Sequence, residues 1–333
     1  VLNLNKRIEE LDTGIESATK AWSECEGLIS AINSADAMHI VSGEGSLGLL
    51  KYIPESIPCH LHLLEPHRGL HEEVLHRRIE GRPRRNIGIT KLLLSRARKR
   101  DLLMIKKINN RHKMYISSNS NYSSNRAEEV YEIKTGVLWP CVDTSEFPPD
   151  GANDVSNPYE TKDDYVVNIG KASWVKGTWE TISMLAETKI SIVHVGGGEA
   201  EDLVKLRKHA DNLDVDLWIA PRLSSPELVS LMRNSRAVVS MAYGEAFGLT
   251  PIEAFAVGVP AIFVNEGGFK DTITDGVNGR LLERNDFQSW HNALEQASIK
   301  EIREKWSIAG KAKIIELDLT PEKHAKRIKQ ILF

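Results

Sequence analysis

Hydrophobic residues in the second half of the chain fall into short runs that alternate with longer, partly polar segments. Short apolar runs rich in β-branched residues predict buried strands, and the spacing of the segments between them is that of helices. Such alternation favours a parallel, doubly wound sheet, which binds ligands at the carboxyl ends of its strands. The expected strands are residues 165–169, 190–195, 215–219, 237–241 and 261–264, and the expected helices are residues 178–187, 200–210, 225–234 and 251–257.

The first half of the chain is less regular, and it indicates a second, partly similar α/β domain. Residues 153–164 are rich in Asn, Asp, Pro and Glu without an apolar period, which predicts a linker. We therefore expect a domain at 1–150, a domain at 151–318 and a carboxyl-terminal helix at 319–333 that is suited to packing back on the first domain. Helical patterns cover residues 8–33, 46–52 and 321–331, and strands are expected at 37–41, 59–64, 114–117 and 136–138.

Composition narrows the class of protein. The chain has 333 residues, of which 41% are hydrophobic, so two domains with ordinary cores are expected rather than disorder. Apolar runs stay well below the roughly 20 residues that span a bilayer, and polar residues interrupt the start of the chain where a secretory leader would need an apolar segment. Cys25, Cys59 and Cys141 are far apart and form no metal-type cluster, which indicates reduced thiols in a cytoplasmic protein.

The net charge of −3 conceals a strongly basic block at residues 76–113, which holds fourteen Lys or Arg and two Asp or Glu. Such a block attracts anions, and the leucines within it would allow a basic helix to lie on an anionic membrane surface. The alternative, which we weigh equally, is a pair of solvated helices whose leucines face the core. Nucleic acid is disfavoured as a partner because few aromatic residues are interleaved with the block.

Residues 243–253, Tyr-Gly-Glu-Ala-Phe-Gly-Leu-Thr-Pro-Ile-Glu, carry the clearest chemical signal. Thr250 and Glu253 have the spacing of a capping box with a proline between them, so a helix is predicted to begin here. Its free N–H groups and its dipole would attract a phosphate or diphosphate, and Gly248 would let the backbone approach the ligand closely. Capping alone would explain Glu253. It would not explain Glu245, a carboxylate just before an anion site.

Two further loops follow expected strands. Residues 170–177 contain Lys171 and Lys176, which can converge on the anion if this loop lies at the same sheet edge, although exposed lysines in turns are usually only solvated. Gly267 and Gly268 follow the strand at 261–264, where a tight turn and a ligand cradle are equally good interpretations.

Together these pieces resemble the carboxyl domain of the family-4 retaining glycosyltransferases, which have the two-domain GT-B fold. A lone Glu-x7-Glu motif would be a weak signal, but six pieces in the family's order over residues 165–280 are a strong one. Lys171 departs from the family pattern by replacing the usual Arg. The matching pieces are Gly170-Lys171 with Lys176-Gly177, residues 193–198, residues 225–237, Glu245 with Glu253 and residues 254–261, Gly267-Gly268, and residues 275–279.

The resemblance implies transfer of a sugar from a nucleotide-diphosphate donor, such as a UDP or GDP sugar, with retention of configuration and without a metal or other cofactor. Departure of the sugar leaves negative charge on the diphosphate and oxocarbenium character on the ring, which cations with a helix N-terminus and a carboxylate would stabilise respectively. The implied site contains Lys171, Lys176 and the N–H groups of Leu249 and Thr250 on the diphosphate, Glu253 on the ribose hydroxyls, Glu245 near the transferred sugar, Arg222 beside the base, and Gly248 and Gly268 in the surrounding loops.

The amino-terminal half resembles the family less. Residues 40–42 and 139–147 match two landmarks, but the opening strand and its glycine-rich loop are not visible, so either a segment precedes Val1 or the domain is unusual. Many relatives carry an active-site histidine after an early strand, and the ungapped register places Leu64 there. His67 follows the strand and is the more exposed candidate for this catalytic role, whereas His62 alternates within the strand. The alternative is ordinary polar residues at a strand end.

Three functions therefore stay open. The first is a transferase that acts on a lipid-linked or membrane-associated acceptor. The second is a soluble disaccharide or sugar-phosphate synthase of the same fold, and the third is a non-catalytic nucleotide-sugar binder. A dinucleotide-dependent dehydrogenase is disfavoured because the glycines at 196–198 do not form Gly-x-Gly-x-x-Gly.

Overall fold

The chain folds into two compact units, each described here by itself. The computed structural model describes residues 15–43, 45–148, 155–160 and 164–333. Unit 1 comprises the described residues up to Glu72 together with Arg85–Pro140 and Glu322–Phe333, and unit 2 comprises Glu73–Arg84 and Cys141–Pro321. The boundary that we expected at residue 150 thus lies near residue 140, and the expected linker at 153–164 falls partly outside the described residues.

The short segment 73–84 comes from the first half of the sequence but packs with unit 2. Gly81 lies against the indole of Trp174, where an added Cβ would meet the ring at 2.7 Å. Glu80 faces Lys205, with 3.8 Å between the carboxylate oxygen and Nζ. The basic block at 76–113 is therefore divided between the two units, a separation that charge counting along the chain cannot reveal.

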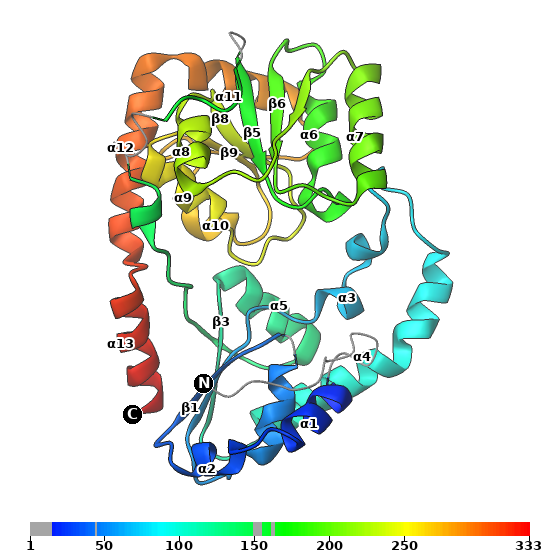
Figure 1. The fold of residues 1–333 in the computed structure, drawn as a ribbon, viewed down its shortest axis with the longest axis vertical. Helices are drawn as coiled ribbons and strands as arrows, with labels where there is room; N and C mark the ends of the chain where they lie inside the picture. Colours follow the sequence, from blue (N-terminus) through cyan, green and yellow to red (C-terminus); the bar gives the residue numbers. More distant parts are fainter. Residues whose placement is uncertain (1–14, 44, 149–154, 161–163) are drawn as a thin grey trace. The chain divides into compact units, whose positions relative to one another are not determined.

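Unit 2 is built on a six-stranded parallel sheet in the order β10-β9-β8-β5-β6-β7 (Figure 1). β5 pairs with β6 on one side and with β8 on the other, so the direction in which strands are added reverses at β5. This is the doubly wound order with a switch point, as expected from the alternating pattern. The strands are β5 Tyr165–Ile169, β6 Ser191–Val195, β7 Leu217–Ile219, β8 Ala237–Ser240, β9 Ala261–Val264 and β10 Arg280–Leu282.

Helices cover this sheet and account for its apolar strands. Every residue of β8 and β9 is buried, as in parallel strands that are covered on both faces. The four helices expected from the pattern are present with ends shifted by one or two residues, whereas β10, α11 and α12 were not predicted. The longer helices are α6 Thr178–Leu185, α7 Ala200–Asn212, α8 Ser225–Arg233, α9 Thr250–Val257, α11 Phe287–Ser298 and α12 Lys300–Leu317, and α10 is the single turn Phe269–Thr272.

Unit 1 contains a four-stranded parallel sheet in the order β1-β2-β3-β4, which adds strands in one direction only. The helix expected at 8–33 is interrupted at Gly27, whose φ of 77° is left-handed, and its residues 8–14 lie outside the described part. The elements are α1 Ile15–Ser23, α2 Leu28–Asn33, β1 Met38–Val41, the 3-10 helix Ser46–Tyr52, β2 Cys59–His62, α3 Arg68–His71, α4 Ile87–Asn109, β3 Met114–Ser118, α5 Asn121–Tyr131, β4 Gly136–Val137 and α13 Pro321–Leu332.

The two faces of the sheet in unit 1 differ in chemistry. Ile40, Cys59 and Leu61 are buried in an apolar core with residues of α4 and α5. Side chains alternate between the faces of a strand, so the residues between these lie on the opposite face. There the strand register aligns His39 with His60 and His62 with Ser117.

Helix α4 is the longest element of the basic block. Its side toward the core carries Ile105 and Ile108, which are buried. Leu92 and Leu93 are 74% and 62% exposed, so the expectation that the leucines of the block face the core is wrong for these two. Among the helices of the described residues, none is both long enough and apolar enough to cross a membrane.

Candidate functional site

The loops that follow β5 and β8 bring opposite charges together at the switch point of unit 2. Lys176 ends the single 3-10 turn Trp174–Lys176 after β5, and Glu245 lies in the loop after β8. Lys176 Nζ donates a hydrogen bond to Glu245 Oε2 over 2.6 Å, and both side chains remain about a quarter to a third exposed. A switch point is where sheets of this order bind ligands, so the cation and the carboxylate are both available to one.

Helix α9 begins differently from the sequence prediction. Thr250 is the first helical residue rather than the cap, and no side chain caps the helix within the described part of the chain. The predicted capping box is therefore wrong, because Leu249 takes the cap position in a helical conformation. The N–H groups of Leu249 and Thr250 have no acceptor among the described residues. Free N–H groups at a helix start attract anions, so the anion site gains donors that a cap would have occupied.

Glu253 is a carboxylate in the first turn of α9 that forms no hydrogen bond within the described residues. Burial raises the pKa of its carboxyl above the ordinary value, and the nearby charge of Glu146 raises it further. Burying part of a charged carboxylate without hydrogen-bond donors costs free energy. It is therefore ready to accept hydrogen bonds from hydroxyl groups of a ligand.

The glycines of the loop regions are required by packing. Gly248 has a φ of +84°, and a Cβ there would meet the ring of Phe269 at 2.5 Å. The N–H of Gly268 donates to the carbonyl of Glu245 over 2.7 Å, and a Cβ on Gly268 would meet the Ala246 carbonyl oxygen at 2.4 Å. Gly267 and Gly268 form a tight turn, and the alternative that they cradle a ligand stays a prediction. This turn holds the backbone on which Glu245 is carried.

Lys171 and Arg222 lie apart from this group. Lys171 Nζ pairs with Glu199 over 2.8 Å, at the start of α7, and both side chains are more than half exposed. Arg222 is exposed in the loop after β7, two strands away from the switch point in the sheet order. The structure therefore brings together Lys176, Glu245 and the start of α9, but not the other two predicted cations.

Arg284 is a largely buried residue that contacts the loops of the site, and sequence reasoning missed it. It is 10% exposed and pairs with Glu266 over 2.7 Å and with Glu180 over 3.1 Å. It also donates to the Met241 carbonyl over 2.5 Å, and its guanidinium lies 3.5 Å from the ring centre of Tyr243. Met241 and Tyr243 come from the loop after β8, Glu266 from the loop after β9 and Glu180 from α6, so Arg284 joins both loops to that helix. The sequence signal that could have identified Arg284 is its position just after β10, and that strand was not predicted.

Unit 1 has a pocket of about 330 Å³ whose lining includes His67, Arg68, Asp101 and Tyr131. Asp101 is a buried carboxylate that accepts hydrogen bonds from the Tyr131 hydroxyl and from His71, each over 2.8 Å. The Tyr131 oxygen in turn accepts from the backbone N–H of His67 over 3.1 Å. His67 is exposed and His62 is buried, as their positions in the sequence predicted. Asp101, which the sequence presented only as a rare acid in a basic block, is a positioning residue for this pocket.

Comparison with known proteins agrees with this geometry. Residues 152–313 match the family model described as glycosyl transferases group 1. A D-inositol 3-phosphate glycosyltransferase of Mycolicibacterium smegmatis is 28% identical over 176 residues, which are 50% of this chain and 40% of that protein. One from Paenarthrobacter aurescens is 39% identical over 75 residues, which are 22% of this chain and 18% of that protein. The chain thus matches less than half the length of these curated relatives.

Solved structures share the fold across nearly the whole chain. Sucrose-phosphate synthase from Thermosynechococcus elongatus has a TM-score of 0.72 at 16% identity, with 97% of this chain and 78% of that chain covered. Anabaena HepE in complex with UDP-glucose has a TM-score of 0.69 at 17% identity, with 97% and 84% covered. These likenesses confirm the predicted two-domain α/β fold, and the family match confirms the resemblance of the carboxyl-terminal half. Residues 152–313 therefore belong to the group 1 glycosyltransferases of the family-4 type, and the chain has their GT-B fold.

Proposed function

We propose that this protein transfers a sugar from a nucleotide-diphosphate sugar to an acceptor, with retention of anomeric configuration. The observation that carries the proposal is the pair of Lys176 and Glu245, 2.6 Å apart, at the switch point of unit 2 beside the uncapped start of α9. A non-catalytic nucleotide-sugar binder would also use the cation for the diphosphate, but it would not need a carboxylate in this position. A dehydrogenase would need the ribose-binding carboxylate at the end of a different strand.

In this proposal the diphosphate binds at the start of α9. The N–H groups of Leu249 and Thr250 donate to its oxygens, and Lys176 turns from Glu245 to the phosphate. Glu253 accepts hydrogen bonds from the ribose hydroxyls. When the bond between the sugar and the diphosphate breaks, the growing negative charge falls among these donors.

Glu245 then has a second role. Without a ligand its charge is balanced by Lys176, and with the donor bound it is free to face the sugar. A carboxylate beside a ring with oxocarbenium character stabilises that positive charge. The acceptor oxygen forms the new bond at the same carbon while its hydroxyl proton passes to the departing diphosphate. We propose that neither step needs a metal ion, because cations and helix N–H groups of the chain supply the positive charge.

A thermal-shift panel with UDP, GDP, ADP and NAD in EDTA tests the donor site on the wild type and on Lys176→Ala. A nucleotide at about 100 times its dissociation constant should add roughly 2.7 kcal/mol to the free energy of unfolding. We expect one nucleoside diphosphate to raise the melting temperature, and Lys176→Ala to remove that rise. The matched control is Lys300→Ala, a lysine 83% exposed at the start of α12, which should leave it unchanged. Stabilisation by NAD alone would refute the proposal.

The acceptor side belongs to unit 1 in this proposal, in the pocket lined by His67. The curated relatives are named as inositol-phosphate glycosyltransferases and one structural neighbour as a sugar-phosphate synthase, so phosphorylated polyols and sugars are the first acceptors to assay. His67→Ala should lower transfer to such an acceptor without changing the thermal shift by the nucleotide. Equal loss of both would show that His67 supports the fold rather than the acceptor.

A second candidate is an acceptor held at a membrane, and the exposed side of α4 favours it. Ile89, Leu92, Leu93 and Leu103 are between 56% and 74% exposed on a helix that also carries many lysines and arginines. Apolar and cationic side chains together favour an anionic lipid surface. The three cysteines are free, which suits a cytoplasmic location for the protein.

Sedimentation with vesicles of anionic and of neutral lipid separates the two acceptor classes. Leu92→Ser with Leu93→Ser should abolish binding to anionic vesicles, as should Lys91→Glu with Arg96→Glu. Ile308→Ser with Ile315→Ser, at positions 71% and 79% exposed on α12, is the matched control and should have no effect. If the wild type ignores both kinds of vesicle, the soluble synthase is the correct alternative.

A further inference from the structure

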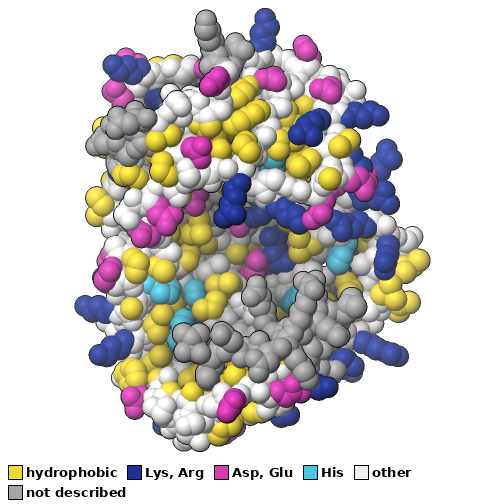
Figure 2. Space-filling view, viewed as in Figure 1, with side chains coloured by type: hydrophobic (Ala, Val, Ile, Leu, Met, Phe, Trp, Pro, Cys, Tyr) yellow, Lys and Arg dark blue, Asp and Glu magenta, His cyan; other side chains and the backbone are white. Residues whose placement is uncertain are grey.

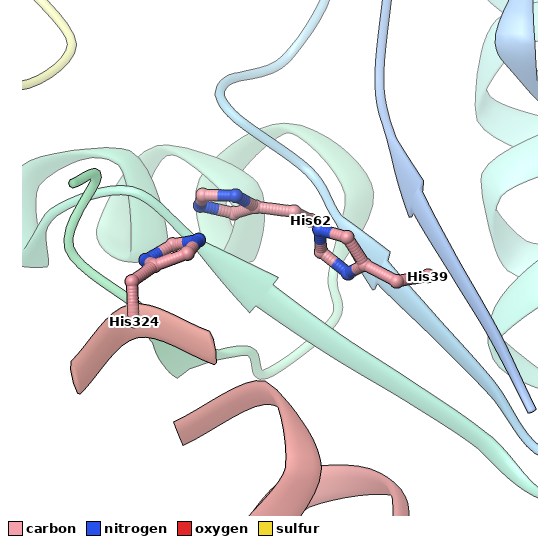
Figure 3. Close-up of side chains that lie close together, drawn as sticks. All are labelled: His39, His62 and His324. Atoms are coloured by element: carbon pink, nitrogen blue, oxygen red, sulfur yellow. The ribbon is translucent and has the colours of Figure 1, made fainter. Parts of the chain in front are cut away.

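Four histidines lie together in unit 1, and none of them lines the pocket beside His67. His39 on β1 and His60 and His62 on β2 project from the polar face of the sheet, and His324 joins them from α13. Figure 2 shows histidine side chains gathered on one part of the surface, and Figure 3 shows the ring of His324 turned toward that of His62. The cluster therefore joins three histidines from the first part of the sequence to His324, which lies near its end.

Three of these rings are close enough to share a ligand. One nitrogen each of His39, His62 and His324 lies within 4.8 Å of the other two. His62 is 3% exposed, and its Nε2 has no hydrogen-bond partner among the described residues. Buried polar atoms nearly always have partners, because an unsatisfied one costs a desolvation penalty. The unpartnered Nε2 of His62 is therefore an independent indication that a ligand binds between the rings.

The remaining ring nitrogens are held as they are in metal sites. His324 Nδ1 lies 2.9 Å from the Trp139 carbonyl oxygen, which can only accept, so Nδ1 carries the hydrogen and Nε2 is left with a lone pair. His62 Nε2 has no partner among the described residues, so it carries a free lone pair when the ring hydrogen is on Nδ1. Donation of the second ring N–H to a carbonyl is the usual support of a metal-binding histidine.

His39 is supported by a chain of hydrogen bonds. Its Nδ1 lies 2.9 Å from His60 Nδ1, and His60 Nε2 lies 2.9 Å from Ser117 Oγ. If His60 donates to the serine oxygen, it accepts from His39 Nδ1, and a lone pair remains on His39 Nε2. With this tautomer assignment, Nε2 of each of the three rings carries a lone pair that is free for a ligand.

We propose that His39, His62 and His324 bind one divalent metal ion of the class that prefers imidazole, with Zn²⁺ as the first choice, and that the ion fastens α13 to the sheet of unit 1. Three histidines with an open fourth position are an established zinc-ligand set, and imidazole also suits copper and nickel. Zn–N distances of about 2.0–2.1 Å in a tetrahedral site put the nitrogens roughly 3.4 Å apart, so the rings close on the ion by rotation of exposed His39 and half-buried His324.

The test uses the tag-free full chain, stripped with EDTA and then titrated with Zn²⁺ by calorimetry and with Co²⁺ by absorption. We expect one ion per chain, a tetrahedral Co²⁺ spectrum and a higher melting temperature. His324→Gln should weaken binding at least about 100-fold, the upper end of what loss of a supporting residue costs, and His39→Gln should do the same. His112→Gln, which changes an exposed histidine of unit 1 outside the cluster, is the matched control and should bind like the wild type.

Circular dichroism of each stripped variant shows whether it folds, and His39→Gln decides alone if His324→Gln does not. Substoichiometric binding by the wild type would overturn the proposal, as would equal binding by a folded His39→Gln or His324→Gln variant. The proposal is independent of the sugar-transfer function, because nucleotide-induced stabilisation in EDTA reports on unit 2 without this metal.

Discussion

The two sheets of this protein use parallel strands in opposite ways. In unit 2 both faces of the central strands are buried, and the polar side chains within them, such as Asn168 and His194, are buried and hydrogen-bonded. The charged pair Lys176 and Glu245 lies instead in the loops at the strand ends. In unit 1 one face of β2 is apolar and the other carries His60 and His62. Candidate chemistry therefore lies at the edge of one sheet and on the face of the other. The first kind of site is local to the strand–loop–helix repeat, and the second depends on what packs over the face.

The largest expected difference between the two units is in how low pH changes their free energy of unfolding. The pKa values of His60 and His62 are lowered to about 3 and about 4. At pH values between the unfolded-state pKa of about 6.5 and these lowered pKa values, the unfolded state binds more protons than the folded state. Acid therefore destabilises unit 1. The expected slope is about 1.4 kcal/mol per pH unit for each histidine, and it vanishes above pH 6.5.

Urea unfolding of the chain in EDTA, followed by amide exchange at pH 7, 6, 5 and 4, measures this for each unit without a metal ion on His62. His62→Gln should flatten the pH dependence of unit 1 while leaving unit 2 unchanged. In unit 2 burial lowers the pKa of His194 and of His209, so these two groups also destabilise the fold in acid. The half-buried carboxyl groups of Glu180 and Glu253 have raised pKa values, and their contribution has the opposite sign, so we expect a smaller acid effect on unit 2. A fall in stability of unit 2 equal to that of unit 1 would break the comparison.

The Lys176–Glu245 pair should show the next largest effect. Lys176→Ala removes a cation from the proposed leaving group and leaves the Glu245 charge unbalanced beside it. We expect kcat/KM for sugar transfer to fall about 10²- to 10³-fold, as for loss of one preorganised donor. Adding Glu245→Gln should restore part of the nucleotide affinity but none of the transfer rate. A double variant that is weaker than Lys176→Ala in nucleotide binding would contradict this arrangement.

Glycine substitutions test how closely the loops of unit 2 pack against one another. Gly177 has a φ of +68°, and a Cβ there would lie 2.1 Å from the Met241 carbonyl oxygen of the neighbouring loop. Gly197 has a similar φ of +61° but open space around it. Gly177→Ala should cost about 3 kcal/mol or more, from backbone strain and overlap together, and Gly197→Ala about 1 kcal/mol from strain alone. Denaturant midpoints give both values, and equal costs would mean that the two loops do not pack as described.

Glu253→Gln should have the smallest effect on stability and an opposite effect on binding. The raised pKa means that the charged form is disfavoured in the folded protein, so removing the charge should raise the melting temperature of the free protein slightly at pH 7. Loss of the charged acceptor should weaken nucleoside diphosphate binding about tenfold or more. Asp286→Asn is the control, since that exposed carboxylate caps α11 away from the site. A variant that gained stability and kept its affinity would exclude Glu253 as the ribose ligand.

Much of unit 2 was determined by the sequence alone. Its strands are continuous apolar runs and its helices follow them directly, because each strand–helix repeat is built from neighbouring residues. The approach of Lys176 to Glu245 was predictable for the same reason, since loops at the carboxyl ends of adjacent strands share one sheet edge. The capping box at Thr250 failed because the same residues also allow a start one position earlier, with Leu249 at the cap.

Only the tertiary structure decided the features that join distant residues. Arg284 contacts Met241 in the loop after β8 and Glu266 in the loop after β9. Asp101 holds the chain around His67 through Tyr131, from a helix some thirty residues further along the chain than His67. His324 reaches His62 only because α13 returns to unit 1 after the whole of unit 2 has been built. Local patterns record the periodicity and charge of neighbouring residues. Contacts between residues that are hundreds of positions apart depend on how completed elements pack, and no local pattern records that.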